Sequence, residues 1–138
     1  MDKNKQQVKS QITFLYYRDL APISAFYESI IGLELVQDYG WAKVYRVNGN
    51  AYLAIVDEKE GFYKVQEKNA VVFGLIVDDE PWWYEYLTSK GVKMLTELSQ
   101  APGRIQVQAF KCQDPGGYAI EIERFLNPEV ARIFHGSD

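Results

Sequence analysis

The chain has 138 residues, a formal net charge of −4 at pH 7, and 14% aromatic residues. This length suits one domain, or a pair of small repeats, with enough chain to bury a hydrophobic core. The mildly acidic balance gives no electrostatic basis for binding nucleic acid or an anionic membrane surface, so we predict neither partner. No apolar run approaches the roughly 20 residues of a membrane span, and the polar N-terminus lacks a signal-peptide core, so we expect a cytoplasmic protein.

Cys112 is the only cysteine, which excludes an intrachain disulfide and fits a reducing compartment. A nucleophilic role for its thiol is disfavoured, because the only histidine, His135, lies in the polar C-terminal tail. A Cys–His pair would need that tail to fold back over a strand.

Residues 1–10 form a polar lead-in, and residues 11–58 show the pattern of a first βαβββ module. The period of the apolar residues changes from two to three and four after Asp19, which predicts a strand, then an amphipathic helix that Gly32 ends. The dipeptide Asn48-Gly49 is a strong hairpin signal between two later strands. The predicted elements are a strand at 12–17, a helix at 20–31, and strands at 33–36, 41–47 and 51–56.

Residues 59–70 are charged and are predicted to form a linker, in which Phe62 and Tyr63 either pin the loop to the body or form the edge of a lid. Residues 71–125 then repeat the βαβββ order, and residues 126–138 form a tail with a short helix near 128–134. The second module is predicted to hold strands at 71–77, 92–95, 104–112 and 118–124, with a helix at 81–90.

The repeat of strand, aspartate, proline, aromatic pair and glycine in both halves determines the architecture that we expect. Each half has one helix, which covers only one face of its sheet. We therefore predict an α+β fold in which two βαβββ repeats form a curved, partly open, barrel-like sheet around a cavity.

Three segments carry a family resemblance: Arg18–Leu20 with Phe26–Leu35, then Val77–Val92, then Asp114–Glu123. They resemble the vicinal oxygen chelate superfamily, which includes glyoxalases, extradiol dioxygenases, fosfomycin-resistance enzymes and bleomycin-resistance proteins. Arg18–Leu20 with Phe26–Leu35 is similar to the family's first strand–helix–strand unit, and Val77–Val92 is similar to the helix of its second module. Asp114–Glu123 (DPGGYAIEIE) is similar to the family's DPxG-x-x-x-E ending. The resemblance spans residues 11 to 125 and implies the glyoxalase/bleomycin-resistance fold.

In metal-dependent members, the resemblance implies four His, Gln or Glu ligands, one from each of four strands. Carried over by register, these positions are Ile12, Ala54, Val72 and Glu121, and only Glu121 has a ligand side chain. One carboxylate among aliphatic neighbours is a poor replacement for the hydration shell of a divalent cation. We therefore expect neither a metal site nor any other cofactor.

Strand parity indicates which other side chains share the cavity face with these positions. The alternation predicts an aromatic and aliphatic groove with a few polar points, which suits a flat or cyclic organic ligand held by stacking and hydrogen bonds. The predicted ligand-binding residues are Phe14, Tyr16, Trp41, Arg104, Gln106, Gln108, Phe110, Glu121 and Glu123.

Three roles remain open for Glu121. Its carboxylate could hydrogen-bond an amine or hydroxyl of the ligand. It could be a catalytic general base whose pKa is raised by apolar neighbours. It could instead form an inert ion pair with Arg104.

Two functions follow from these patterns, with a third in reserve. The leading hypothesis is a metal-independent, non-catalytic binder of a small organic molecule, similar to bleomycin-resistance proteins. The alternative is a glyoxalase-like lyase or a dioxygenase-like enzyme that uses Glu121 with an atypical metal set or as a base. The reserve is a partner-binding module with a vestigial cavity. Since the family commonly forms homodimers, we expect one here, and an exposed tryptophan of the pair Trp82-Trp83 would suggest its contact.

Overall fold

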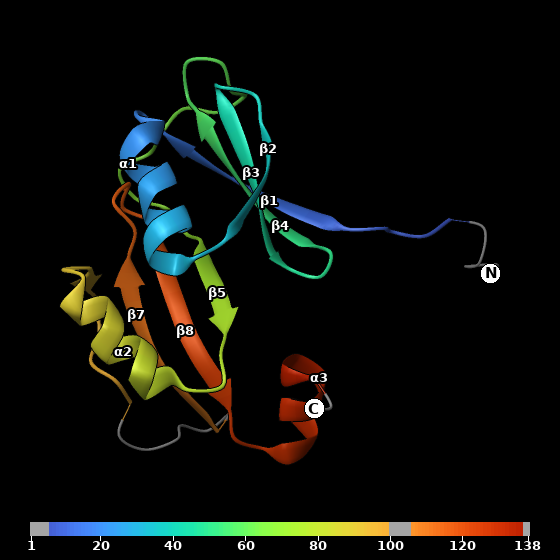
Figure 1. Ribbon diagram of the computed structural model, residues 1–138, viewed down its shortest axis with the longest axis vertical. Helices are drawn as coiled ribbons and strands as arrows, with labels where there is room; N and C mark the ends of the chain where they lie inside the picture. The colour runs from blue at the N-terminus through green and yellow to red at the C-terminus, as the bar shows by residue number, and fades with distance from the viewer. Residues whose placement is uncertain (1–5, 100–105, 137–138) are drawn as a thin grey trace. The chain divides into compact units, whose positions relative to one another are not determined.

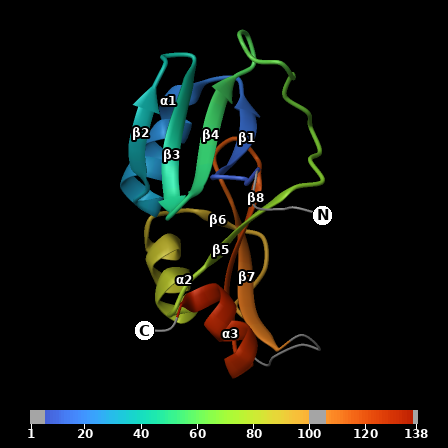
Figure 2. The ribbon, with the colours of Figure 1, turned by 90° about the vertical axis from the view of Figure 1, so that its right-hand side faces the viewer.

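The computed structural model describes residues 6–99 and 106–136, and the chain divides into two compact units, residues 1–66 and 67–138. Each unit holds one open, four-stranded mixed sheet, which confirms the predicted α+β fold (Figures 1 and 2). The elements of the first unit are β1 (Gln11–Tyr17), α1 (Leu20–Ala25), η1 (Phe26–Ile31), β2 (Glu34–Asp38), β3 (Ala42–Asn48) and β4 (Ala51–Asp57). Those of the second are β5 (Val72–Ile76), α2 (Glu80–Ser89), β6 (Lys93–Met94), β7 (Val107–Gln113), β8 (Ala119–Phe125) and α3 (Pro128–His135).

The first sheet has the strand order β1-β4-β3-β2, with β1 parallel to β4 and the other neighbours antiparallel. Helix α1 and its continuation η1 cover one face of this sheet (Figure 2). Leu15 and Tyr17 of β1 are 2% exposed, whereas Phe14, which points to the opposite face of the strand, is 55% exposed. The period-two alternation therefore separates a core face under the helix from an open face on the other side.

The single helix predicted over residues 20–31 is two consecutive segments, an α-helix and a π-helix. Asp19 caps the start, because its carboxylate accepts a hydrogen bond from the Ala21 N–H at 3.2 Å. Gly32 ends the π-helix at φ +87°, a left-handed conformation that favours glycine. The predicted stop signals were therefore correct, and the wider π turn was not anticipated.

A polar cluster joins the helical segment to β3 on the core face. The hydroxyl of Tyr45, which is fully buried, donates to the Glu28 carboxylate at 2.7 Å and lies 3.0 Å from the Ser24 hydroxyl. Ser24 also donates to Glu28, at 2.6 Å. The hydrogen bonds from Ser24 and then Tyr45 lower the pKa of Glu28, and burial raises the pKa of Tyr45. Each buried polar atom of this cluster is thus satisfied.

The second sheet has the order β5-β8-β7-β6, with β5 parallel to β8. Helix α2 packs on the face that carries Phe110, Ile120 and Ile122, and the ring of Tyr84 meets the Phe110 ring edge-on at 5.1 Å. Trp82 is 52% exposed, whereas Trp83 is partly buried rather than in the core. Leu87 is the buried apolar residue of α2.

The two open faces have equivalent positions. In the first sheet, Phe14 of β1 lies beside Ala54 of β4, which lies beside Val44 of β3. In the second sheet, the same positions are taken by Gly74, Glu121 and Lys111. The internal repeat extends to individual residues, and yet one open face is apolar where the other is charged.

The tail folds into α3 and packs against the end of β8. His135 bonds the Asp78 carboxylate through Nδ1 at 3.0 Å, and its Nε2 accepts the N–H of Phe125 at 3.1 Å. The rings of Phe125 and Phe134 stack at 4.6 Å. No helix in the ranges 6–99 and 106–136 is long and apolar enough to cross a membrane.

Candidate functional site: a pocket on the first unit

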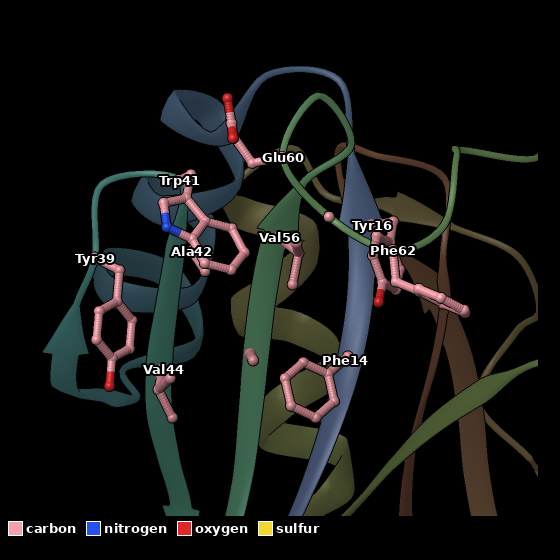
Figure 3. A pocket seen from close by; sticks show the side chains of 11 residues that line it. Phe14, Tyr16, Tyr39, Trp41, Ala42, Val44, Val56, Glu60 and Phe62 are labelled. Carbon is pink, nitrogen blue, oxygen red and sulfur yellow. The ribbon is translucent and has the colours of Figure 1, made fainter.

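A pocket of about 300 Å³ lies on the open face of the first sheet, opposite the helix (Figure 3). Its floor consists of small side chains from the two central strands, Ala42 and Val44 of β3 and Ala54 and Val56 of β4. Because a sheet normally fills such a face with larger residues, alanine at two of these four positions creates the hollow.

Aromatic side chains rise on the two sides of this floor. Phe14 and Tyr16 project from β1, and Tyr39 and Trp41 come from the turn between β2 and β3 (Figure 3). Phe14, Tyr39 and Trp41 are each between 46% and 60% exposed, so their ring faces are open to a ligand. Aromatic rings facing each other across a flat apolar floor form a site for a planar molecule.

A turn after β4 closes one end of the pocket with Glu60, Gly61 and Phe62. The turn is held by the Asp57 carbonyl, which accepts the N–H groups of Glu60 and Gly61 at 3.1 and 3.0 Å. Of the two alternatives for residues 62 and 63, the structure bears on pinning, and the edge of a lid stays a prediction. The ring of Tyr63 packs edge-on against Tyr16 at 5.8 Å and pins the segment, while Phe62 lines the pocket.

The electrostatics of the pocket are simple. Glu60 is the one carboxylate among the lining residues of the described chain, and no Lys, Arg or His side chain is among them. The remaining polar groups are the hydroxyls of Tyr16 and Tyr39 and the indole N–H of Trp41. An anionic ligand would therefore leave water without a compensating positive charge.

The predicted residues of the first module lie where parity placed them. Phe14, Tyr16 and Trp41 line the pocket, and their role as ligand-binding residues stays a prediction. Several other lining residues were not predicted from the sequence. Val56 is two residues from Ala54 on β4, and Val44 is the neighbour of Ala54 on β3, so both lie on the same face as Ala54. Strand parity could therefore have identified these two floor residues. The missed lining residues are Tyr39, Ala42, Val44, Val56, Glu60, Gly61 and Phe62.

The prediction that Gln108 and Phe110 of β7 face the cavity was wrong, because these residues point to the opposite face of the strand. Phe110 is 1% exposed and lies under α2, and Gln108 accepts a hydrogen bond from Arg124 Nη2 at 2.8 Å. Neither faces the side of the sheet that carries Glu121, because Phe110 pairs with Ile122 and Gln108 with Arg124. Gln106 precedes β7, is exposed and has φ +54°. Arg104 lies outside the described residues.

The residue that faces Glu121 is Lys111, directly opposite on β7. Its Nζ lies 3.0 Å from Glu121 Oε2, and the expected partner Arg104 lies outside the described residues, so the three roles considered for Glu121 stay predictions. A hydrogen bond with Glu123 and then the Lys111 contact lower the pKa of Glu121, contrary to the raised pKa expected of a base. Burial, followed by the hydrogen bond and charge of Glu121, raises the pKa of Glu123 to about 7.

A second cluster lies on the helix face of the same sheet. Glu80 is fully buried and accepts a hydrogen bond from Arg124 Nε at 2.8 Å, with Nη2 at 3.4 Å from its other oxygen. Since Arg124 also reaches Gln108, this cluster ties the start of α2 to both central strands. Cys112, on the same face, is fully buried, and burial followed by the charge of Asp114 raises the pKa of its thiol to about 11. The thiol is thus unsuited to nucleophilic attack.

The metal that the resemblance implies does not fit the side chains present. Ile12, Ala54 and Val72 offer carbon only, and Glu121 is already paired with Lys111. A divalent cation prefers several oxygen or nitrogen donors. The described residues hold no group of three or more His, Cys, Asp or Glu side chains arranged for a metal ion.

Comparison with known proteins identifies the family. Residues 10–122 match the model of the Glyoxalase/Bleomycin resistance protein/Dioxygenase superfamily, and the chain belongs to this family. No curated protein matches the sequence. Solved structures with the same fold include a lactoylglutathione lyase from Agrobacterium tumefaciens, at 19% identity and TM-score 0.68, with 86% of this chain and 94% of that chain covered. Another is TioX from Micromonospora sp. ML1, at 14% identity and TM-score 0.68, with 86% of this chain and 100% of that chain covered.

Proposed function

We propose that this protein binds a small, planar organic molecule, without a metal, in the pocket of the first unit. The observation that supports the proposal is the hollow itself, an apolar floor between two aromatic walls. Stacking on Trp41 and Phe14 would supply orientation and much of the affinity. A volume of about 300 Å³ is at the small end of ligand pockets and fits a molecule of two or three fused or linked rings.

The charge of the ligand follows from the lining. With Glu60 at the rim and no cationic side chain in the lining, a neutral or cationic molecule is favoured over an anion. The family description covers bleomycin-resistance proteins as well as glyoxalases and dioxygenases. The pocket is apolar, and aliphatic side chains stand at three of the family's metal-ligand positions. Both features favour a protein that sequesters its ligand, in the manner of the resistance proteins.

The test fills the pocket from its floor. Ala54→Leu adds three carbons where Ala54 is 1% exposed, between Phe14 and Val44. The matched control is Ala25→Leu, an identical change at an exposed position of α1. Both variants and the wild type would be titrated with N-phenyl-1-naphthylamine, a neutral planar fluorescent probe, and with cationic and anionic dyes of similar size.

We expect the wild type and Ala25→Leu to bind the neutral or cationic probe equally, and Ala54→Leu to lose at least about tenfold in affinity. Trp41→Phe should remove most of the accompanying change in tryptophan fluorescence. Equal binding by Ala54→Leu and Ala25→Leu, or a preference for the anionic dye, would contradict the proposal.

A second candidate function is supported by the open face of the second sheet. Glu121 and Glu123 are adjacent on one face with Lys111 opposite, and the pKa of Glu123 near 7 suits proton transfer at neutral pH. If the protein is a glyoxalase-like or dioxygenase-like enzyme, Glu123 is a better base than Glu121. An activity screen with Glu123→Gln and Glu121→Gln tests this: turnover that survives Glu123→Gln would exclude the role.

The assembly is a separate proposal. We infer a homodimer from the family resemblance and from the exposed Trp82 on α2. Light scattering after size exclusion tests this assembly. A dimer whose Kd is about 1 µM would be mostly dimeric at roughly 50 to 100 µM, so a monomer at that concentration would contradict the proposal.

A further inference from the structure

We propose that Gly61 is a specificity-determining residue that fixes the length of the ligand accepted by the pocket. Gly61 lines the pocket and lies against the side chains of Val56 and Tyr16, which are labelled in Figure 3. This inference rests on the proposed binding function only for the ligand-affinity measurements described below, and not for the stability measurements.

The space at Gly61 has no room for a side chain. A Cβ at this position would lie 2.7 Å from Val56 Cγ1, 2.8 Å from Tyr16 Cε1 and 3.1 Å from Tyr16 Cδ1. Ordinary van der Waals contact begins at 3.4 Å, so a methyl group would require shifts of about 0.6 to 0.7 Å. Gly61 has no positive φ, so glycine is needed here for close approach and not for its backbone conformation.

The turn that carries Gly61 is the fixed partner in this contact. The Asp57 carbonyl holds the N–H of Gly61, and the Glu58 N–H donates to the Tyr17 carbonyl at 2.9 Å. Further along, the Glu58 carboxylate accepts the N–H of Val65, also at 2.9 Å. With the backbone anchored before and after Gly61, the side chains that border the pocket must yield.

The Val56 side chain must shift, because its Cγ1 is the nearest atom to the added Cβ, and the other part that must move is the ring of Tyr16. The Tyr16 ring meets the Tyr63 ring edge-on and also borders the pocket, and the pocket is the open space into which the Tyr16 ring can move. A methyl group on residue 61 therefore takes up the closed end of the pocket, either directly or through displacement of Tyr16. In both cases a ligand that reaches this end loses contact area, whereas a shorter one stacked on Trp41 does not.

The experiment compares two probes of different length. N-Phenyl-1-naphthylamine is the long probe and 1-naphthylamine the short one. Gly61→Ala is the test variant, and Gly74→Ala is the matched control, since a Cβ at Gly74 meets nothing within 4 Å and its φ is not positive. We expect Gly61→Ala to weaken the long probe at least about tenfold and the short probe less than about threefold. Gly74→Ala should change neither.

A second arm separates steric closure from damage to the turn. In a background of Tyr16→Ala with Val56→Ala, both contacting side chains are truncated. Adding Gly61→Ala to that background should then change the long probe's affinity and the melting temperature far less than it does in the wild type. If Gly61→Ala is equally harmful in both backgrounds, the turn itself has been disrupted, and the inference is wrong.

The outcomes distinguish this inference from the proposed function. A wild type that binds neither probe refutes the proposed function, and the stability comparison in the two backgrounds still decides whether Gly61 closes against Tyr16 and Val56. A wild type that binds both probes, with Gly61→Ala weakening them equally or not at all, refutes the length filter and leaves the binding function standing.

Discussion

The carboxyl pair on β8, Glu121 and Glu123, predicts that the free energy of unfolding falls as the pH rises from about 4.5 to about 7. Glu123 has a pKa of about 7 in the folded protein against 4.5 for an ordinary glutamate, because of burial and of the neighbouring Glu121. A group with a raised folded pKa stabilises the protein fully below the unfolded pKa, and this contribution is lost as the pH rises to the folded one. For Glu123 the window is therefore pH 4.5 to 7.

The magnitude follows from the shift. The difference between about 7 and 4.5 corresponds to at most roughly 3.4 kcal/mol, at 1.36 kcal/mol per pKa unit. Because the side chain is only half-buried, solvent screens the interaction, and we expect about 1–2 kcal/mol. Glu121 does not oppose this effect in the same window, since its pKa is lowered and its contribution is lost only as the pH falls through that lowered value.

The assay is urea unfolding at pH 5 and pH 8 for the wild type and Glu123→Gln. We expect the free energy of unfolding of the wild type to be lower at pH 8, and that of Glu123→Gln to change much less. Glu85→Gln, at an exposed position of α2, is the control for removal of one negative charge. If the wild type and Glu123→Gln show the same pH dependence between 5 and 8, the assignment of the raised pKa to Glu123 is wrong.

Three further predictions concern the cores of the two units. Arg124→Met should lower the free energy of unfolding by about 3 kcal/mol in urea, because Glu80 would stay buried without its cation, and a loss below about 0.5 kcal/mol would contradict the ion pair's role. Native Cys112 should fail to react with Ellman's reagent at pH 8 and react fully in urea, and rapid reaction of the native protein would show that the thiol is accessible. Tyr45→Phe should cost about 1–2 kcal/mol and raise the pKa of Glu28, measured by carboxyl NMR, and an unchanged pKa would exclude the hydrogen bond.

The fold was predictable because its signals are local and repeated. Asp19 and Asp79 begin the two main helices as caps, and Gly32 and Gly91 follow their ends at positive φ. The π-helical second half of the first helix was not predictable, since an apolar spacing of three and four fits an α-helix as well. A π turn is selected by tertiary packing, which places Phe26, Tyr27 and Ile31 in the core.

Parity placed Phe14 and Tyr16 on the open face of the first unit, where they line the pocket, but it put Gln108 and Phe110 on the wrong face of β7. On β1 the choice came from the family register, which puts Ile12 on the cavity face and therefore Phe14 and Tyr16 with it, opposite Leu15 and Tyr17. Strand β7 carries apolar residues on both faces, and alternation alone could not choose between them. The turn after Asp114 held the missing information, because it pairs Gln113 with Ala119 and so places Phe110 beside Ile122 under the helix.

The residue-by-residue correspondence of the two sheets has a consequence for engineering. Ala54 and Val44 on one sheet occupy the places of Glu121 and Lys111 on the other, over the same ladder of strands. Alanine at position 121 and valine at position 111 would give the second sheet the same central pair, on the face away from α2. A full copy of the floor would also need valine at position 123, because Glu123 occupies the place of Val56. The reverse substitutions, Ala54→Glu with Val44→Lys, would place the same pair of charged residues on adjacent strands of the first sheet.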